Sequence, residues 1–235
     1  MKHTEIKIYK VGGCVRDSLL GVKSKDIDYS VEAPSFEAMY EAIKMLGAEI
    51  FLEKPEYFTI RAKWRDDAAD FVLCRKEGSY YDGRHPSSVE VGTIYDDLAR
   101  RDFTVNAMAQ VVDDPNGTII DPHGGMRDLQ SRMIRCVGSA GERFTEDGLR
   151  MLRAIRFSIT KDFILDSDII ALLINRSFWE PRLGGVSIER IREELHKCFI
   201  HNTPRTLATF DLYRSLRGYL FTTGGLWLKP TLEGR

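Results

Sequence analysis

Two aspartates, Asp26 and Asp28, flank a single isoleucine in the segment KDIDYSVE. Polar and apolar residues alternate there, which predicts a strand, and side chains two apart on a strand point to the same face. Carboxylates held that close repel each other, and a divalent cation between them relieves the repulsion. The pair therefore indicates a magnesium site, although a polar edge strand or a turn accounts for the same pattern.

A third carboxylate, Asp70, lies in the predicted strand ADFVLCR, where Phe71 and Leu73 are directed to the opposite face. Three acids on two adjacent strands suit two magnesium ions, of which one activates an attacking hydroxyl and the other holds a triphosphate. Asp66 and Asp67 are weaker candidates. They fall at the expected tip of a hairpin, where solvated turn residues are common.

A phosphate-binding turn is predicted upstream, where Gly12 and Gly13 separate a strand over residues 6–11 from a helix over residues 14–20. Glycine backbone can approach a phosphate closely, and the N-terminus of a helix favours negative charge. Arg16, in the first helical turn, can grip phosphate oxygens with its forked guanidinium. A plain tight turn explains a glycine pair alone, but here the predicted metal carboxylates follow within the same short segment.

The elements that must position these groups can be read from the hydrophobic pattern. Strands are expected over residues 6–11 and 25–32 and in an antiparallel hairpin over 56–64 and 69–75. Ser35 is the expected N-cap of a helix that ends near residue 46. Residues 76–92 have no apolar periodicity and form a loop long enough to suggest a function. A helix begins near residue 96, and residues 116–138 are typical of a small strand, turn, helix and strand.

After residue 141 the pattern becomes all-helical, beginning with a helix over residues 144–159 that Thr145 caps. A mixed front followed by helices is typical of the α+β class. The sequence has 34 Lys and Arg against 35 Asp and Glu, so its near-neutral balance gives no overall signature of nucleic-acid binding.

No apolar run approaches the roughly 20 residues that a bilayer requires, and the start lacks the apolar core of a signal peptide. We therefore expect a cytoplasmic protein with no membrane partner. The cysteines are far apart and have no zinc-ligand spacing, which indicates reduced, part-buried structural thiols. They are Cys14, Cys74, Cys136 and Cys198.

The stretch VGGCVRDSLLGVKSKDIDYSV resembles the signature of tRNA nucleotidyltransferases and bacterial poly(A) polymerases, the class II group of the DNA polymerase β-like nucleotidyltransferases. Downstream, DLARRDFTVNAMA is similar to the family's ribose-contacting motif and IIDPHGGMRDL to its hinge. EDGLRMLRAIRF is similar to its base-selecting motif, and SIERIREEL to the helix that supports that motif. The resemblance covers about residues 8–199, and several motifs in order are more specific than any one of them.

The resemblance implies a polymerase β-like head, an all-helical neck and a short helical remnant of the body. It assigns residues 1–140 to the catalytic head, 141–200 to the neck with the base-selecting motif, and 201–235 to a short helical segment. It also implies that the loop at 76–92 helps the pocket change from CTP to ATP. The site residues that it implies are Asp26, Asp28 and Asp70 as magnesium ligands, Gly12, Gly13 and Arg16 on the triphosphate, and Arg101, Asp102 and Asn106 on the ribose and phosphates.

The base-selecting motif can also be argued from hydrogen bonding. Asp147 and Arg150 are three apart on the predicted helix and so share a face. Cytosine and adenine each present an amino donor beside a ring-nitrogen acceptor, which a carboxylate beside a guanidinium complements. Glu146 and Arg153 would orient these two groups or stack nearby. The alternative is an exposed ion pair along one helix, which contributes little.

The expected activity is template-independent addition of CCA to the 3′ end of tRNA from CTP and ATP, with Mg²⁺ as cofactor and pyrophosphate as product. Partial enzymes that add only CC or only A, and poly(A) polymerases, share the same motifs. A small-molecule nucleotidyltransferase would share the fold but has no need of EDGLR. A non-catalytic RNA-binding module is the alternative of another class, which three intact acids argue against.

Family members usually continue into helical domains that hold the tRNA, and the 235 residues do not include them. We expect either a shortened or unusually compact member, or one in which a second copy of the chain or a partner supplies the grip on RNA.

Overall fold

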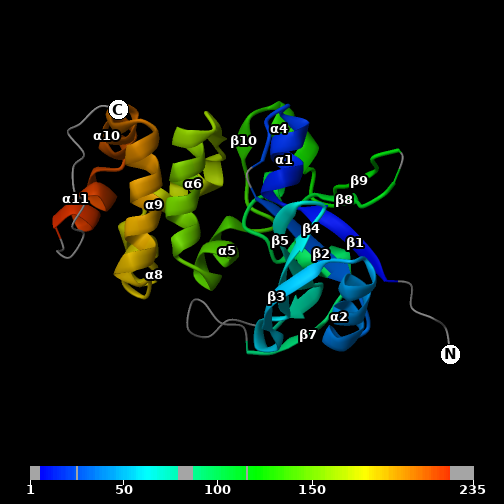
Figure 1. Ribbon diagram of the computed structural model, residues 1–235. Coiled ribbons are helices and arrows are strands. Elements are labelled where there is room, and N and C mark those ends of the chain that lie inside the picture. Colours follow the sequence, from blue (N-terminus) through cyan, green and yellow to red (C-terminus); the bar gives the residue numbers. More distant parts are fainter. Residues whose placement is uncertain (1–5, 25, 79–86, 115, 223–235) are drawn as a thin grey trace. The chain divides into compact units, whose positions relative to one another are not determined.

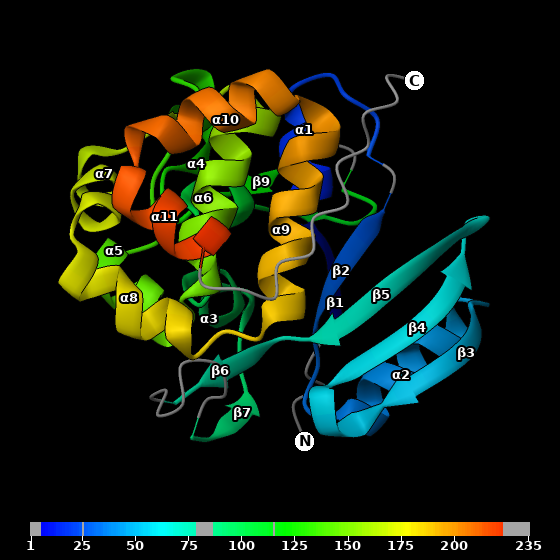
Figure 2. The ribbon, with the colours of Figure 1, turned by 90° about the vertical axis from the view of Figure 1, so that its left-hand side faces the viewer.

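The computed structural model describes residues 6–24, 26–78, 87–114 and 116–222 (Figures 1 and 2). Contacts divide these residues between two units. The first unit contains the described residues up to Ser131, and the second contains those from Arg132 onward. The division into a catalytic head, a neck and a C-terminal segment at residues 140 and 200 is a proposal about function.

A mixed sheet of seven strands forms the first unit, in the order β3-β4-β5-β2-β1-β8-β9. β2 and β5 run parallel, and every other neighbouring pair is antiparallel. Together with the helices, this sheet confirms the predicted α+β class. The strands are β1 Lys7–Val11, β2 Ile27–Glu32, β3 Glu49–Lys54, β4 Thr59–Trp64, β5 Asp67–Leu73, β8 Ala109–Val111 and β9 Ile119–Ile120.

Alternation along the strands separates an apolar face from a polar one. The apolar side chains of β2, β4 and β5 are buried with α2 (Phe36–Met45), which Ser35 caps as predicted. The rings of Tyr29 and Phe71 stack with centroids 4.8 Å apart, and Trp64 meets Tyr29 edge-on. Figure 2 shows α2 behind β3, β4 and β5. The alternate residues of β2 and β5, which include the predicted carboxylates, therefore point to the other face.

Short helices contact the strands that carry those carboxylates. α1 (Gly13–Leu19) contacts β1 and β2, and α3 (Ile94–Ala99) contacts β2. Ser30, on the polar face of β2, donates a hydrogen bond of 2.9 Å to Asp97 of α3. The 3₁₀ turn η2 (Thr104–Asn106) contacts α1 and α4 (Gly125–Gln130).

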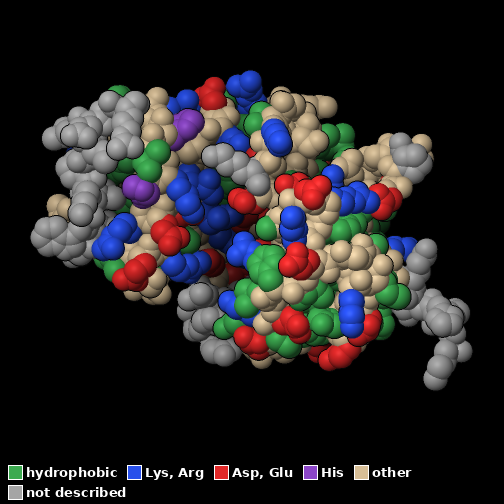
Figure 3. Space-filling view, in the orientation of Figure 1, with side chains coloured by type: hydrophobic (Ala, Val, Ile, Leu, Met, Phe, Trp, Pro, Cys, Tyr) green, Lys and Arg blue, Asp and Glu red, His purple; other side chains and the backbone are tan. Residues whose placement is uncertain are grey.

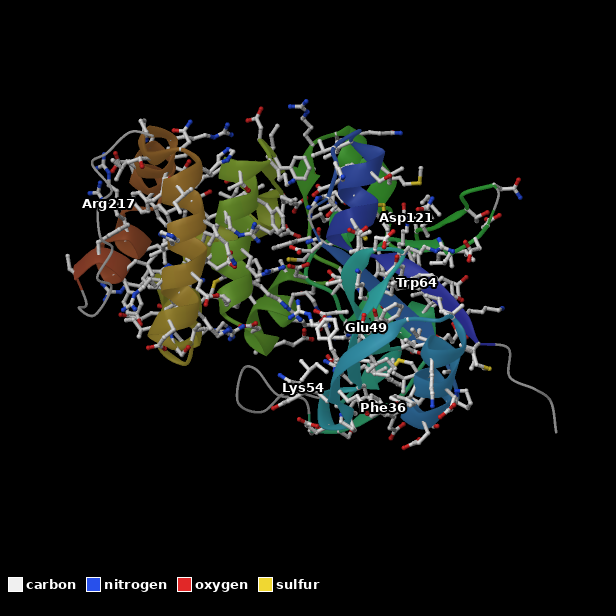
Figure 4. All side chains as sticks on the ribbon, viewed as in Figure 1. Phe36, Glu49, Lys54, Trp64, Asp121 and Arg217 are labelled. Carbon is white, nitrogen blue, oxygen red and sulfur yellow. The ribbon has the colours of Figure 1, made fainter. Side chains whose placement is uncertain are left out.

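Three local differences from the sequence expectation occur in this unit. β3 was not predicted; it is a mostly exposed edge strand, whose ends Glu49 and Lys54 are labelled in Figure 4. The strand expected to begin at residue 56 begins later, because a 3₁₀ turn, η1 (Pro55–Tyr57), precedes β4. The ends of the expected loop 76–92 form an antiparallel ribbon of β6 (Arg75–Glu77) and β7 (Val89–Val91), and residues 79–86 lie outside the described part.

The second unit is mainly helical, as predicted. β10 (Met133–Ile134) and β11 (Ile164–Leu165) pair in parallel, and α6 and α9 pack side by side (Figures 1 and 2). Trp179, Phe144 and Leu195 are among its buried apolar side chains. Its helices are α5 Ala140–Glu146, α6 Leu149–Thr160, α7 Ser167–Ile174, α8 Arg176–Gly184, α9 Ile188–His201, α10 Thr203–Leu212 and α11 Arg214–Thr222.

All four cysteines are free, as their spacing predicted, and they are buried rather than part-buried. Burial raises the pKa of the Cys198 thiol to about 12, so this thiol remains protonated near neutrality. Within the described ranges, no helix combines the length and the apolar character needed to cross a membrane.

Candidate active site

The predicted carboxylates lie where β2 and β5 pair. Asp28 is the register partner of Asp70 across this parallel pair, which confirms that the two acids lie on adjacent strands. Asp26 directly precedes β2, two residues before Asp28, and is exposed. Ile27, between the two acids, packs against the apolar core on the other face. Strand register therefore brings Asp28 and Asp70 together, whereas alternation had predicted only the face to which each points.

The electrostatics of Asp28 reflect this crowding. Its carboxylate is accessible to solvent, yet the surrounding protein atoms raise its pKa by desolvation, and repulsion from Asp70 and Asp26 raises it further. Attraction to Arg101 and Arg61 acts in the opposite direction. Desolvation is the largest cause of this rise, and the neighbouring carboxylates add to it.

Arg61 is a member of this site that the sequence analysis missed. It lies opposite Asp70 in the antiparallel β4–β5 pair, and its Nε is 3.0 Å from Asp70 Oδ1. The hairpin tip contains only Arg65 and Asp66, both with positive φ, rather than the three residues expected. Counting back from this two-residue turn would have placed Arg61 opposite Asp70.

Gly12 separates β1 from α1 in a conformation that only glycine adopts readily, with φ 72° and ψ −128°. A Cβ atom at this position would lie 2.7 Å from Nη1 of Arg101. The same Nη1 donates a hydrogen bond of 3.4 Å to the carbonyl oxygen of Asn106. The absence of a side chain at Gly12 thus allows a guanidinium to lie against the turn between strand and helix.

Arg101 is anchored by Asp97, whose side chain is 0% exposed. Asp97 accepts hydrogen bonds from Arg101 Nη2 at 3.0 Å, from Arg100 Nη2 at 2.6 Å and from Ser30. Desolvation opposes the charge on Asp97, but the two arginines outweigh it and lower the pKa of this carboxyl group. Sequence reasoning missed Asp97, although its spacing of three and four residues from two arginines on a helix is a usable signal.

The remaining predicted phosphate and ribose residues form one buried network. Arg16, 5% exposed, pairs with Asp17 at 2.9 Å and donates to Oδ1 of Asn106. Asn106 Nδ2 donates in turn to Asp102 Oδ1 at 3.1 Å, and the same oxygen accepts from the Phe103 amide at 2.8 Å. The structure therefore joins Arg16, Asp102 and Asn106, and the network fixes their orientation.

A divalent ion suits this part of the first unit. All the predicted ligands are carboxylates, which hard cations prefer, and the guanidinium of Arg61 already stands in for a cation on Asp70. Among the described residues, no three His, Cys, Asp or Glu side chains lie close enough together to enclose a metal. The residues fit an ion held by one or two carboxylates, with phosphate oxygens and water as its other ligands.

In the second unit, the helix expected over residues 144–159 is interrupted, so the expectation of one continuous helix is wrong. α5 ends at Glu146, Asp147 is extended with φ −151°, and α6 begins at Leu149. Ser139, not Thr145, caps α5. At Gly148 a Cβ atom would collide with the carbonyl group of Arg182, so close packing on α8 requires glycine there.

This interruption changes the pairing expected for the base-selecting residues. Arg150 donates to Glu146 at 2.5 Å and to the carbonyl oxygen of Arg143 at 3.1 Å. Asp147 instead accepts from Arg190 of α9 at 2.7 Å and from the amide of Leu149 at 3.0 Å. Asp147 and Arg150 are therefore each held by a different neighbour and do not share a face of one helix.

Arg153 lies one turn further along α6. Its Nη1 is 3.9 Å from Oε1 of the buried Glu194, and its guanidinium carbon is 5.9 Å from the centre of the Phe157 ring. Glu194 also pairs with Arg156 at 2.5 Å. Figure 3 shows Lys and Arg side chains gathered over the surface of α5 and α6. The second unit thus offers positive charge around Asp147 and Glu146.

The sequence is similar to a known family and to enzymes of several bacteria. The family model for the poly A polymerase head domain matches residues 8–135. The CCA-adding enzyme of Geobacillus kaustophilus is 35% identical over 223 residues, which are 93% of this chain and 52% of that enzyme. The CCA-adding enzyme of Geobacillus thermodenitrificans is 39% identical over 190 residues, which are 80% of this chain and 44% of the relative.

Solved structures of CCA-adding enzymes are also similar to this chain. The CCA-adding enzyme of Bacillus stearothermophilus in complex with CTP matches with a TM-score of 0.73 and 32% identity, over 89% of this chain and 48% of that one. The Thermotoga maritima CCA-adding enzyme complexed with tRNA matches with a TM-score of 0.71 and 30% identity, over 90% and 48%. The chain thus spans about half the length of the relatives that it matches.

Proposed function

Because the chain belongs to the poly A polymerase head domain family, we propose that it adds CCA to the 3′ end of tRNA from CTP and ATP. The observation that carries this proposal is the pairing of Asp28 with Asp70, near the arginine that Gly12 accommodates. The similarity to CCA-adding enzymes, two of them solved with CTP and with tRNA, supports the same substrates.

In the proposed reaction, the 3′-hydroxyl oxygen of the RNA attacks the α-phosphorus of the nucleotide. A new P–O bond forms as the bond between the α-phosphorus and its bridging oxygen breaks, pyrophosphate leaves with that electron pair, and the proton of the hydroxyl passes to the solvent. Nucleotidyltransferases of this family use a divalent metal ion. We propose Mg²⁺, which when bound supplies Lewis-acid stabilisation of the charge on the phosphates.

The chain's own residues position the reactants. Asp28 and Asp70, with Asp26, are proposed to hold the ion on the polar face of the sheet. Arg16 and Arg101 bring fixed positive charge to the triphosphate, at a turn where Gly12 and Gly13 let backbone approach a phosphate. Asp102 and Asn106, whose orientation the buried network fixes, are proposed to contact the ribose. Anchored groups of this kind need no rearrangement as charge moves to the leaving pyrophosphate.

Selection of the base is proposed for the second unit. Asp147 would accept a hydrogen bond from the amino group of cytosine or adenine, and Arg150 would donate a hydrogen bond to the ring nitrogen. Arg190 of α9 pairs with Asp147 and Glu146 of α5 pairs with Arg150, so different elements orient the two groups. Arg153 is proposed to bring positive charge near the nucleotide.

We also propose a cytoplasmic location, which the four free, buried cysteines support. The overall charge of −1 provides little general attraction for RNA, so a second copy of the chain or a partner is proposed to contribute to RNA binding. Sedimentation with and without tRNA tests this point.

The test of the proposed function is an incorporation assay with Mg²⁺ and tRNA lacking its CCA end. Radiolabelled CTP alone should add CC, and CTP with ATP should complete CCA. Arrest at CC with both nucleotides, addition of A only to tRNA that already ends in CC, or a long A tail would each overturn CCA addition in favour of a narrower enzyme or a poly(A) polymerase. RNA binding without any incorporation would favour a non-catalytic module.

A further inference from the structure

Arg61 is held differently from the other arginines of the first unit's site. The guanidinium approaches Asp70 with Nε 3.0 Å from Oδ1, and the two side chains are 51% and 37% exposed. Within the described part of the chain, the Arg61 side chain makes no ion pair with any other residue. Arg101, in contrast, is anchored by the buried Asp97 and by the carbonyl oxygen of Asn106.

The position of Arg61 is nevertheless fixed by the sheet. β4 and β5 pair with Arg61 opposite Asp70, and β5 and β2 pair with Asp70 opposite Asp28. One row across three strands therefore contains a cation, a carboxylate and a second carboxylate on the same face. Attraction to Arg61 also reaches Asp28, since it counters part of the rise in the pKa of that group.

We propose that Arg61 is an exchangeable counter-cation of Asp70, which neutralises this carboxylate until a divalent ion displaces the guanidinium. The inference rests on the proposed function, because it takes Asp28 and Asp70 as the metal site. Ion pairs this exposed contribute little stability, so a doubly charged ion that also interacts with Asp28 outcompetes the single contact of Arg61.

This exchange makes Arg61 a positioning residue that sets the affinity for metal. In the folded chain, the guanidinium of Arg61 lies 3.0 Å from one carboxylate oxygen of Asp70. Release of the guanidinium would leave Asp70 free to coordinate. Cross-strand pairs also form for structural reasons alone, and such a pair would leave the affinity for metal unchanged when it is removed.

The experiment compares Arg61→Gln with Lys63→Gln. Lys63 is exposed, lies two residues further along β4 on the same face, and is opposite Ala68 rather than a carboxylate. Both variants remove one positive charge from the same strand. Mn²⁺ is titrated into each variant and into the unmodified chain without nucleotide, and the free ion is followed by electron paramagnetic resonance.

We expect Arg61→Gln to bind Mn²⁺ about two- to fivefold more tightly than the unmodified chain, the range for loss of an exposed competing ion pair. Lys63→Gln should bind as the unmodified chain does, and Arg61→Lys should stay close to it because the charge is retained. In an Asp70→Asn background, Arg61→Gln should produce a smaller change, since the carboxylate for which the two cations compete is gone and only the attraction of Arg61 to Asp28 remains. Circular dichroism verifies that each variant is folded.

Two failures are distinguishable. If the unmodified chain binds Mn²⁺, and Asp28→Asn weakens this binding, but Arg61→Gln matches Lys63→Gln, the exchange is wrong and the metal site stands. If no variant binds Mn²⁺, or Asp28→Asn has no effect, the proposed metal site itself is contradicted, and the exchange with it.

Discussion

The two units hold their charged residues in contrasting ways. In the first, Asp97 is wholly buried and fastens Arg101, while Arg16 is buried against Asp17. In the second, Asp147 pairs with Arg190 and Arg150 with Glu146, and these side chains are all partly exposed. We infer that the buried ion pairs of the first unit, which form a rigid frame, serve the phosphoryl transfer that every nucleotide undergoes. The separately held side chains of the second unit serve the choice between nucleotides. Each prediction below tests this contrast.

The largest effect is expected from Asp97→Asn, which removes the charge that balances two arginines. Loss of a buried partner of this kind should lower the free energy of unfolding by about 3 kcal/mol. Urea denaturation near neutral pH measures this change. The matched control is Asp113→Asn, which breaks an exposed ion pair with Arg65 and should cost less than about 1 kcal/mol. Similar losses in the two variants would show that the frame is not specially anchored.

The stability difference between the unmodified chain and Asp97→Asn should also depend on pH. The pKa of Asp97 is lowered in the folded chain, so its contribution is complete above the unfolded value of about 3.9. That contribution is lost as the pH falls through the lower folded value. The stability difference between the unmodified chain and Asp97→Asn should therefore be constant from neutrality to about pH 5 and should shrink below about pH 4. A difference that already declines above pH 6 would contradict this assignment.

Asp28→Asn should lower nucleotide incorporation by at least about a hundredfold, because a bound metal supplies several kcal/mol of charge stabilisation. The measurement is kcat/KM for CTP at saturating tRNA and Mg²⁺. Asp66→Asn serves as the control, since Asp66 lies exposed in the turn between β4 and β5 and Asn tolerates its positive φ. Comparable activity in the two variants would remove the catalytic role from the sheet carboxylates.

A smaller effect is expected from Gly148→Ala, which inserts a methyl group against the backbone of Arg182. Forced repacking of this kind costs about 1–3 kcal/mol. Gly218→Ala is the control: its Cβ meets nothing within 4 Å, and it lies inside α11, so a gain of about 0.5–1 kcal/mol is expected. Thermal melts of both variants give the comparison, and a neutral Gly148→Ala would mean that the interruption between α5 and α6 does not depend on this contact.

The first unit's carboxylates could be predicted because alternation along a strand has a fixed period. The face to which Asp28 and Asp70 point follows from this local pattern, whereas the pairing of β2 with β5 joins segments that are distant in the sequence. Arg61 could not be placed while the hairpin tip was taken as three residues. One residue of register decides which side chains face each other across a pair of strands.

The second unit was harder to predict because its contacts link distant segments. A run with helical periodicity predicted one helix, but tertiary packing of Gly148 on α8 ends α5 and starts α6. Arg190, the partner of Asp147, comes from α9, far along the sequence. No local signal in EDGLR specifies that partner, so the pairing expected between Asp147 and Arg150 was wrong, and their role in base selection stays a prediction.

The most direct test of the division between the units is the ratio of kcat/KM for CTP to that for UTP, measured for Asp28→Asn and Asp147→Asn. Asp28→Asn should lower both values equally and leave the ratio unchanged. Asp147→Asn should lower the ratio by about tenfold or more, since one base contact contributes about 1–3 kcal/mol of discrimination. A changed ratio in Asp28→Asn, or an unchanged one in Asp147→Asn, would contradict the assignment of reaction and selection to separate units.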